Sequence, residues 1–117
     1  MAAGIYNFII EQGVTLTKTF TYTDANGDPI DLTGYDARMQ GRATMQSSAT
    51  VFERTTTPAN GLTIPIGTDG SIAMTMTATE TAELPCGGIY DLEIVSPSGT
   101  VTRLLQGSFS LSYEVTR

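Results

Sequence analysis

Hydrophobic and polar residues alternate along most of this chain. The clearest stretch is residues 88–95, where Tyr90, Leu92 and Ile94 are separated by acidic residues. A period of two places one set of side chains in a core and the other in water, which indicates a half-buried β-strand. Further short or alternating apolar runs predict strands over residues 14–22, 35–42, 51–54, 62–66, 71–77, 101–105 and 108–115. The pattern predicts an all-β chain.

Turn-forming residues separate these runs. Residues 24–29 contain Asn-Gly followed by proline, and residues 96–99 contain Pro-Ser-Gly, so both segments are expected to reverse the chain. Gly107 lies between two of the predicted strands and is expected to form a bulge or bend. Lys18 falls among the apolar positions of its strand, so either that side of the strand leaves the core there or the amine reaches out to solvent.

One short helical turn is predicted near residues 78–84. Thr77 and Glu80 have the spacing of a capping box, and Pro85 ends the pattern. A helical turn just before a strand that carries a tyrosine resembles one corner of immunoglobulin-like sandwiches, where the tyrosine lies two residues before a disulfide cysteine. Tyr90 would be that tyrosine, with Leu92 in place of the cysteine. The sequence thus predicts an immunoglobulin-like antiparallel β-sandwich.

The chain has 117 residues and a mass of 12.4 kDa, which is the size of one sandwich, so residues 1–117 are expected to form a single domain. Its formal net charge is −6 and its arginines form no cluster, which argues against nucleic acid and anionic membranes as partners. Cys86 is the sole cysteine and cannot form an internal disulfide. No signal peptide and no membrane-spanning segment is expected.

The residue types argue against catalysis. The chain has no histidine, which removes the commonest general base and metal ligand. The carboxylate pairs Asp91/Glu93 and Glu80/Glu83 are expected to be solvated surface groups. We therefore expect no enzyme activity, no cofactor and no small-molecule substrate.

Two binding alternatives stay open at this point. Asp24, Asn26 and Asp28 have the first spacings of a calcium loop, although Pro29 replaces the required glycine and Tyr35 the bidentate glutamate. A plain turn is the simpler interpretation. Exposed tyrosines could bind glycans, but the five tyrosines mostly fall at apolar positions, which favours core or subunit contacts.

The two ends of the chain contain the candidate interface. Residues 1–12 are expected to form either the first edge strand of the domain or an arm that adds a strand to a neighbouring subunit. The carboxyl end, residues 113–117, has the same two interpretations. The candidate interface residues are Ile5, Tyr6, Phe8, Ile9, Ile10, Tyr113 and Val115.

Four segments, residues 5–13, 31–40, 101–107 and 114–117, resemble those of small structural proteins of tailed bacteriophages. The Asp-Leu-Thr-Gly string at 31–34 is also loosely similar to the amino-terminal domain of phage baseplate upper proteins. The resemblance implies a non-enzymatic virion protein, made in the host cytoplasm. It would assemble as a homo-oligomer and connect tail, baseplate or tail-fibre components. A capsid decoration protein, or a glycan- or calcium-binding module on the virion surface, is the alternative.

Overall fold

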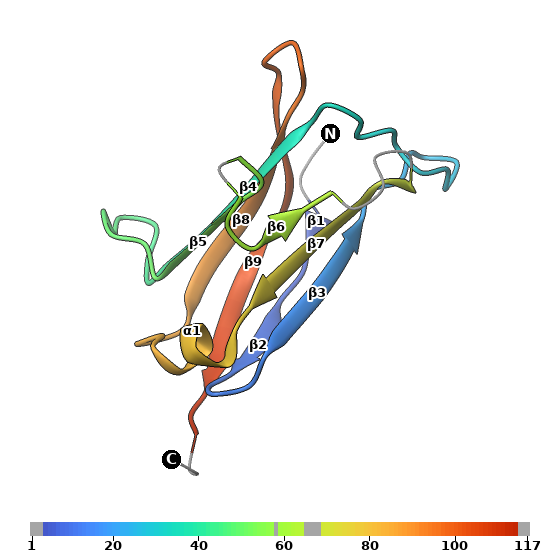
Figure 1. Ribbon diagram of the computed structural model, residues 1–117. Coiled ribbons are helices and arrows are strands. Elements are labelled where there is room, and N and C mark those ends of the chain that lie inside the picture. The colour runs from blue at the N-terminus through green and yellow to red at the C-terminus, as the bar shows by residue number, and fades with distance from the viewer. Residues whose placement is uncertain (1–3, 58, 65–68, 115–117) are drawn as a thin grey trace.

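The computed structural model describes residues 4–57, 59–64 and 69–114. Its strands form two sheets that face each other (Figure 1). The elements are β1 (Gly4–Ile5), β2 (Phe8–Glu11), β3 (Leu16–Thr21), β4 (Asp36–Arg42), β5 (Phe52–Thr55), β6 (Leu62–Thr63), β7 (Ser71–Met76), α1 (Ala78–Ala82), β8 (Gly88–Val95) and β9 (Val101–Ser112).

The strand order is that of an immunoglobulin-like sandwich. The larger sheet has the order β1-β9-β8-β4-β5, with β2 also paired to β9, and the smaller sheet has the order β3-β7-β6. This matches the variable-type arrangement, in which strands G, F, C and C′ form one sheet and B, E and D belong to the other. The helix α1 lies between β7 and β8, as predicted. The all-β immunoglobulin-like prediction is confirmed.

One part of the fold differs from the antiparallel prediction. Both β1 and β2 run parallel to β9, with Gly4 opposite Leu105 and Phe8 opposite Phe109. The first and last strands are thus neighbours in the larger sheet. The amino-terminal segment pairs with β9 of its own domain and forms an edge of the larger sheet, which is the first of its two predicted interpretations.

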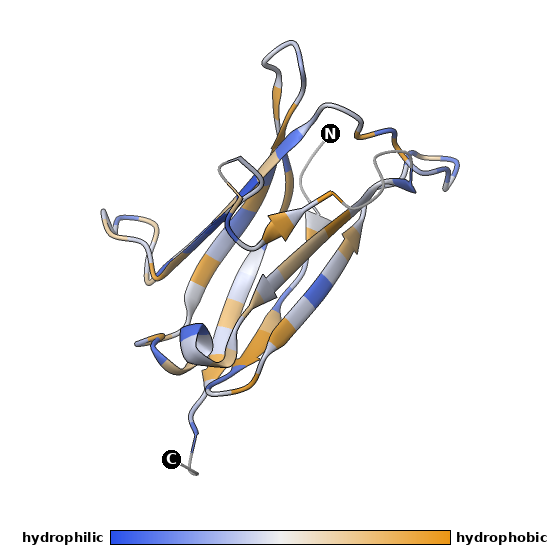
Figure 2. Ribbon diagram, in the orientation of Figure 1, coloured by the Kyte–Doolittle hydropathy of each residue, from blue (hydrophilic) through white to orange (hydrophobic). Residues whose placement is uncertain are grey.

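Alternation along the strands builds the core, as the hydropathy colouring in Figure 2 shows. Phe20, Ile72 and Met74 extend from the smaller sheet, and Met39 and Leu92 meet them from the larger one. Complete burial of a side chain of this size contributes roughly 1.5–3 kcal/mol relative to exposure. Both methionines of β7, including Met76, are therefore core residues.

The edge between the two sheets is protected by Lys18. This residue faces inward from β3, and its Nζ donates a hydrogen bond to the Tyr6 hydroxyl at 3.1 Å while lying 5.7 Å from the ring centroid. An inward-pointing charge at a sheet edge opposes the addition of a foreign strand. The Lys18 amine thus leaves the core and contacts the hydroxyl and ring of Tyr6.

A buried arginine joins β5 to α1. The Arg54 side chain is buried, and its guanidinium donates to the Glu80 carboxylate at 2.7 Å and to Asn60 Oδ1 at 3.3 Å. Glu80 also accepts a bond from the Thr77 amide in the predicted capping box. The pKa of Glu80 is lowered, first by the Thr77 amide and then by Arg54. The helix therefore supplies the counter-ion for a charge that the core would otherwise leave unpaired.

Replacing Glu80 by alanine is expected to lower the free energy of unfolding by about 3 kcal/mol, because it leaves the buried guanidinium without its anionic partner. Urea denaturation at pH 7 measures this. Glu83→Ala, which removes an exposed carboxylate from the end of the same helix, is the matched control and should change stability by less than about 0.5 kcal/mol. Equal stability of the two variants would contradict a structural role for the pair.

Candidate functional site

A contact that reaches across β9 positions the amino-terminal segment. The Tyr90 side chain extends from β8 past Gly107 of β9, and its hydroxyl donates to the Tyr6 carbonyl at 2.5 Å. The Tyr6 amide donates in turn to the Gln106 carbonyl at 3.0 Å. Burial, with Tyr6 nearby, raises the pKa of Tyr90 to about 12, so the hydroxyl keeps its proton across the physiological range. The phenol is thus a fixed donor between the first strand and the sheet.

Gly107 makes this crossing possible. A Cβ at this position would collide with the Tyr6 carbonyl and approach Asn7 Oδ1 within 2.7 Å. Asn7 Oδ1 accepts the Ser108 amide at 2.9 Å, which completes the hydrogen bonding where β1 ends and β2 begins. The predicted bulge at Gly107 is wrong, since β9 is continuous there. The register of the β8–β9 pairing shifts elsewhere, between Leu92, which lies opposite Leu105, and Glu93, which lies opposite Arg103.

The segment from β1 to β2, residues 4–11, is here called the first strand. Its predicted interface residues divide into two sets. Phe8 and Ile10 lie in the core of their own domain, and Phe8 packs edge-on against Tyr90 with ring centroids 5.0 Å apart. Neither of these two side chains is available on the surface. Ile5 and Ile9 face outward and are 76% and 62% exposed. The alternation of side chains along the strand therefore divides the predicted interface residues between the core and the surface.

The remaining candidates lie at the surface or outside the described residues. Tyr6 is partly covered by Phe20, Phe8 and Lys18 at the sheet edge. Tyr113 follows the end of β9 and is exposed. Val115 falls outside the described residues. The structure does not bring Tyr113 together with Ile5, because Ile5 lies opposite Gln106 in the middle of β9 whereas Tyr113 follows the end of that strand at Ser112.

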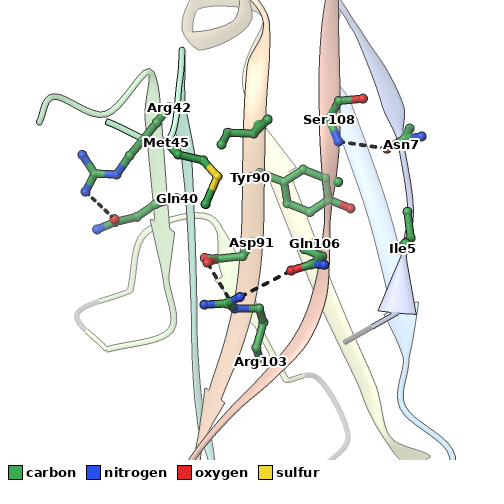
Figure 3. A pocket seen from close by; sticks show the side chains of 12 residues that line it. Ile5, Asn7, Gln40, Arg42, Met45, Tyr90, Asp91, Arg103, Gln106 and Ser108 are labelled. Atoms are coloured by element: carbon green, nitrogen blue, oxygen red, sulfur yellow. Dashed lines mark hydrogen bonds and ion pairs between the residues drawn. The ribbon is translucent and has the colours of Figure 1, made fainter. Parts of the chain in front are cut away.

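Outward-facing side chains of the larger sheet form the candidate site, here called the outer face. Part of it is hollowed, with a volume of about 560 Å³, and Figure 3 shows the side chains that line the hollow. Exposed apolar groups border it, including Met45, which is 82% exposed in the loop after β4. The outer face consists of Ile5, Ile9, Asp36, Arg38, Gln40, Arg42, Met45, Glu53, Ile89, Asp91, Glu93, Arg103, Gln106, Ser108 and Ser110.

Charged side chains on the outer face pair across neighbouring strands. Arg38 Nε of β4 lies 2.8 Å from the Glu93 carboxylate of β8, and Arg103 Nε of β9 lies 3.5 Å from Asp91. Arg42 donates to Gln40 Oε1 at 2.9 Å. Such exposed pairs are individually worth about 0–1 kcal/mol, so their main effect is to hold the side chains in position.

Asp91 is the most perturbed carboxylate of the outer face. Its pKa is raised, mainly by burial in the hollow and then by Glu93, while Arg103, Arg38 and Arg42 oppose the rise. The hollow thus holds a carboxylate surrounded by cations. The described residues contain no group of three or more cysteine or acidic side chains that could hold a metal.

The segment with the first spacings of a calcium loop forms a turn that is stabilised by its own side chain. Asp24 Oδ1 accepts the amides of Asn26 and Asp28 at 2.9 and 3.0 Å, so the carboxylate caps its own turn.

Among the described residues, no helix is long and apolar enough to cross a membrane.

Several outer-face residues were missed in the sequence. Arg38, Gln40 and Arg42 occupy the polar positions of a predicted strand, and that parity could have placed them together on one face. Met45 lies in a loop without any periodic pattern, so only the structure shows that it borders the hollow.

Substitution of Gly107 by alanine is expected to destabilise the domain by about 2 kcal/mol, because the new methyl group must displace the Tyr6 carbonyl from Tyr90. Gly4→Ala in the adjacent strand is the control, since its Cβ would lie 3.1 Å from a flexible Leu105 methyl group and at an ordinary contact distance of 3.7 Å from the Leu104 carbonyl oxygen. Guanidinium denaturation compares the two. A Gly107→Ala protein as stable as the Gly4→Ala protein would refute the crossing as a constraint.

The raised pKa of Asp91 makes its ionisation unfavourable in the folded state. The folded chain keeps this proton above the ordinary pKa of 3.8, so the contribution of Asp91 to stability is greatest in acid and falls as the pH rises through the folded pKa. Asp91→Asn removes this penalty, and its stability relative to the parent chain should increase from pH 3 to pH 7. Thermal unfolding at both pH values tests this, with the exposed loop variant Asp28→Asn as control; a relative stability that decreases would contradict it.

Comparisons with known proteins give distant structural likenesses and no sequence relative. No protein-family model and no curated protein matches the chain. A structural match is found to a chain in "Crystal structure of ICOS in complex with ICOS-L and an anti ICOS-L VNAR domain", with a TM-score of 0.48 and 11% identity. The match covers 96% of this chain and 56% of the other, so this chain spans little more than half of the matched one.

Proposed function

We propose that this chain is a non-enzymatic structural protein of a tailed-phage virion. It binds copies of itself and other virion proteins, and connects tail, baseplate or tail-fibre components. The phage assignment rests on the sequence resemblance of residues 5–13, 31–40, 101–107 and 114–117. The mode of binding is argued from the outer face.

The exposed isoleucines of the first strand carry this proposal. Ile5 and Ile9 point to solvent from a strand that is already paired with β9 and anchored through Tyr6. Large apolar groups held rigidly at a surface favour association, because covering them gains about 25 cal/mol per Å² of apolar area removed from water. No ordering of a mobile arm is needed beforehand, which reduces the entropic penalty of binding.

This binding mode differs from strand donation. The hydrogen bonds of β2 with β9 are made within the chain, and the Lys18 amine bonds to the Tyr6 hydroxyl beside this edge. Partners therefore dock against side chains on the outer face. A capsid decoration protein would dock in the same way, whereas a glycan- or calcium-binding module has no comparable supporting feature in the described residues.

Mass spectrometry of purified particles from the phage that encodes the chain tests the proposal. The protein should be present in many copies per particle. Ile5→Ser/Ile9→Ser should reduce its incorporation at least about tenfold, since two apolar contacts of about 1 kcal/mol each are lost. Val14→Ser changes an exposed apolar residue in the turn before β3 and is the matched control. Absence of the protein from particles would overturn the proposal.

A further inference from the structure

Charges on the outer face are sorted by strand. In the order across the larger sheet, β9 carries Arg103, β8 carries Asp91 and Glu93, β4 carries Arg38 and Arg42, and β5 carries Glu53. The outer face thus shows basic, acidic, basic and acidic stripes in succession, about 5 Å apart as neighbouring strands are. Asp36, at the start of β4, is the exception.

Acidic groups predominate over the rest of the described surface. Arg54 is buried against Glu80, and Lys18 is engaged with Tyr6 at the sheet edge. The outer face therefore contains the remaining described basic side chains of a chain whose net charge is −6. Acidic residues away from the outer-face stripes are Glu11, Asp24, Asp28, Asp31, Asp69, Glu83 and Glu114. Contacts through other surfaces would bring like charges together.

The stripe order is complementary to itself. Consider a two-fold axis that lies between two facing copies, runs parallel to the strands and passes over the gap between β8 and β4. It places β8 of the second copy over β4 of the first, and β9 of the second copy over β5 of the first. Every acidic stripe then meets a basic stripe. Glu93 is level with Arg38, and Arg103 is level with Thr55, two residues along β5 from Glu53. We propose that the outer face binds a second copy of this chain, face to face, through these four complementary stripes.

The uncharged groups fit the same arrangement. Ile89 lies on β8 opposite Arg42 of β4, and Met45 follows in the loop beyond it. The two-fold places Ile89 of each copy over the β4 end of the other, near Met45, so both exposed apolar groups are covered. The intramolecular pair of Arg38 and Glu93 holds both side chains in place before the second copy arrives.

The inference rests on the proposed function and specifies one of its contacts. Because β1 and β2 lie outside β9, Ile5 and Ile9 extend beyond the stripes and stay free for other virion proteins. A face-to-face pair of copies therefore presents two such edges. Interactions between exposed charges are screened over about 10 Å at 0.1 M salt, so the association should depend strongly on salt.

Sedimentation velocity on two charge-reversal variants tests the proposal. The parent chain should dimerise reversibly at 20 mM salt and about tenfold more weakly at 500 mM. Arg38→Glu alone and Glu93→Arg alone should each be monomeric, because each sets like charges against each other at both symmetry-related contacts. An equimolar mixture of the two should dimerise, since every contact between them is complementary again. Glu83→Arg, away from the outer face, should behave as the parent chain does.

The combined variant Arg38→Glu/Glu93→Arg keeps opposite charges within each chain and should also dimerise. The combined variant replaces the mixture experiment if thermal denaturation shows that one of the single variants is unfolded. A parent chain that is monomeric at 20 mM salt, single variants that dimerise like the parent, or a mixture that stays monomeric would each overturn the proposal. Incorporation into particles is measured independently, so the proposed function can hold while this contact fails.

Discussion

The hydrogen bond from the Tyr90 hydroxyl to the Tyr6 carbonyl is the constraint on which the larger sheet depends. It spans β9 and is possible because Gly107 has no side chain at the crossing point. It fixes the height of the first strand against the last one, and so determines which side chains of residues 4–11 enter the core. Phe8 and Ile10 then complete the sandwich, while Ile5 and Ile9 become surface.

Much of the fold could be predicted from local patterns. The alternation of Tyr90, Leu92 and Ile94 gave the correct inward face of β8, and the capping-box spacing of Thr77 and Glu80 gave the helix. These features depend on residues within a few positions of each other. Period-two alternation sorts side chains between faces whatever the strand order is, which is why the core was predictable before the topology.

Features that join distant segments were not predictable in the same way. The sequence indicated no acceptor for the Tyr90 hydroxyl, and the observed acceptor is the Tyr6 carbonyl, 84 positions away. The parallel pairing of residues 8–11 with β9 has no local pattern, and Gly107 resembled a bulge because its true neighbour is also remote. The charge pattern of the outer face was unpredictable for the same reason, because its stripes form only when β9, β8, β4 and β5 lie side by side in this order.

Fixing the first strand within the domain also changes how this protein can bind others. A strand that is paired with β9 in its own chain, with the charged Lys18 amine beside its Tyr6 ring, offers a partner its outward side chains. Specificity then depends on the pattern of side chains on the outer face. The balance of charges there, within an acidic chain, restricts the orientations in which copies can approach without repulsion.

Amide hydrogen exchange, measured by NMR at a dilution where the chain is monomeric, tests the central claim most directly. The amides of Tyr6 and Gln12 bond to the carbonyls of Gln106 and Ser112 within the same chain. They should be protected from exchange to nearly the same degree as the amides of β8 and β9. Rapid exchange of Tyr6 and Gln12 in the monomer, with β8 and β9 protected, would show that the first strand does not belong to its own domain.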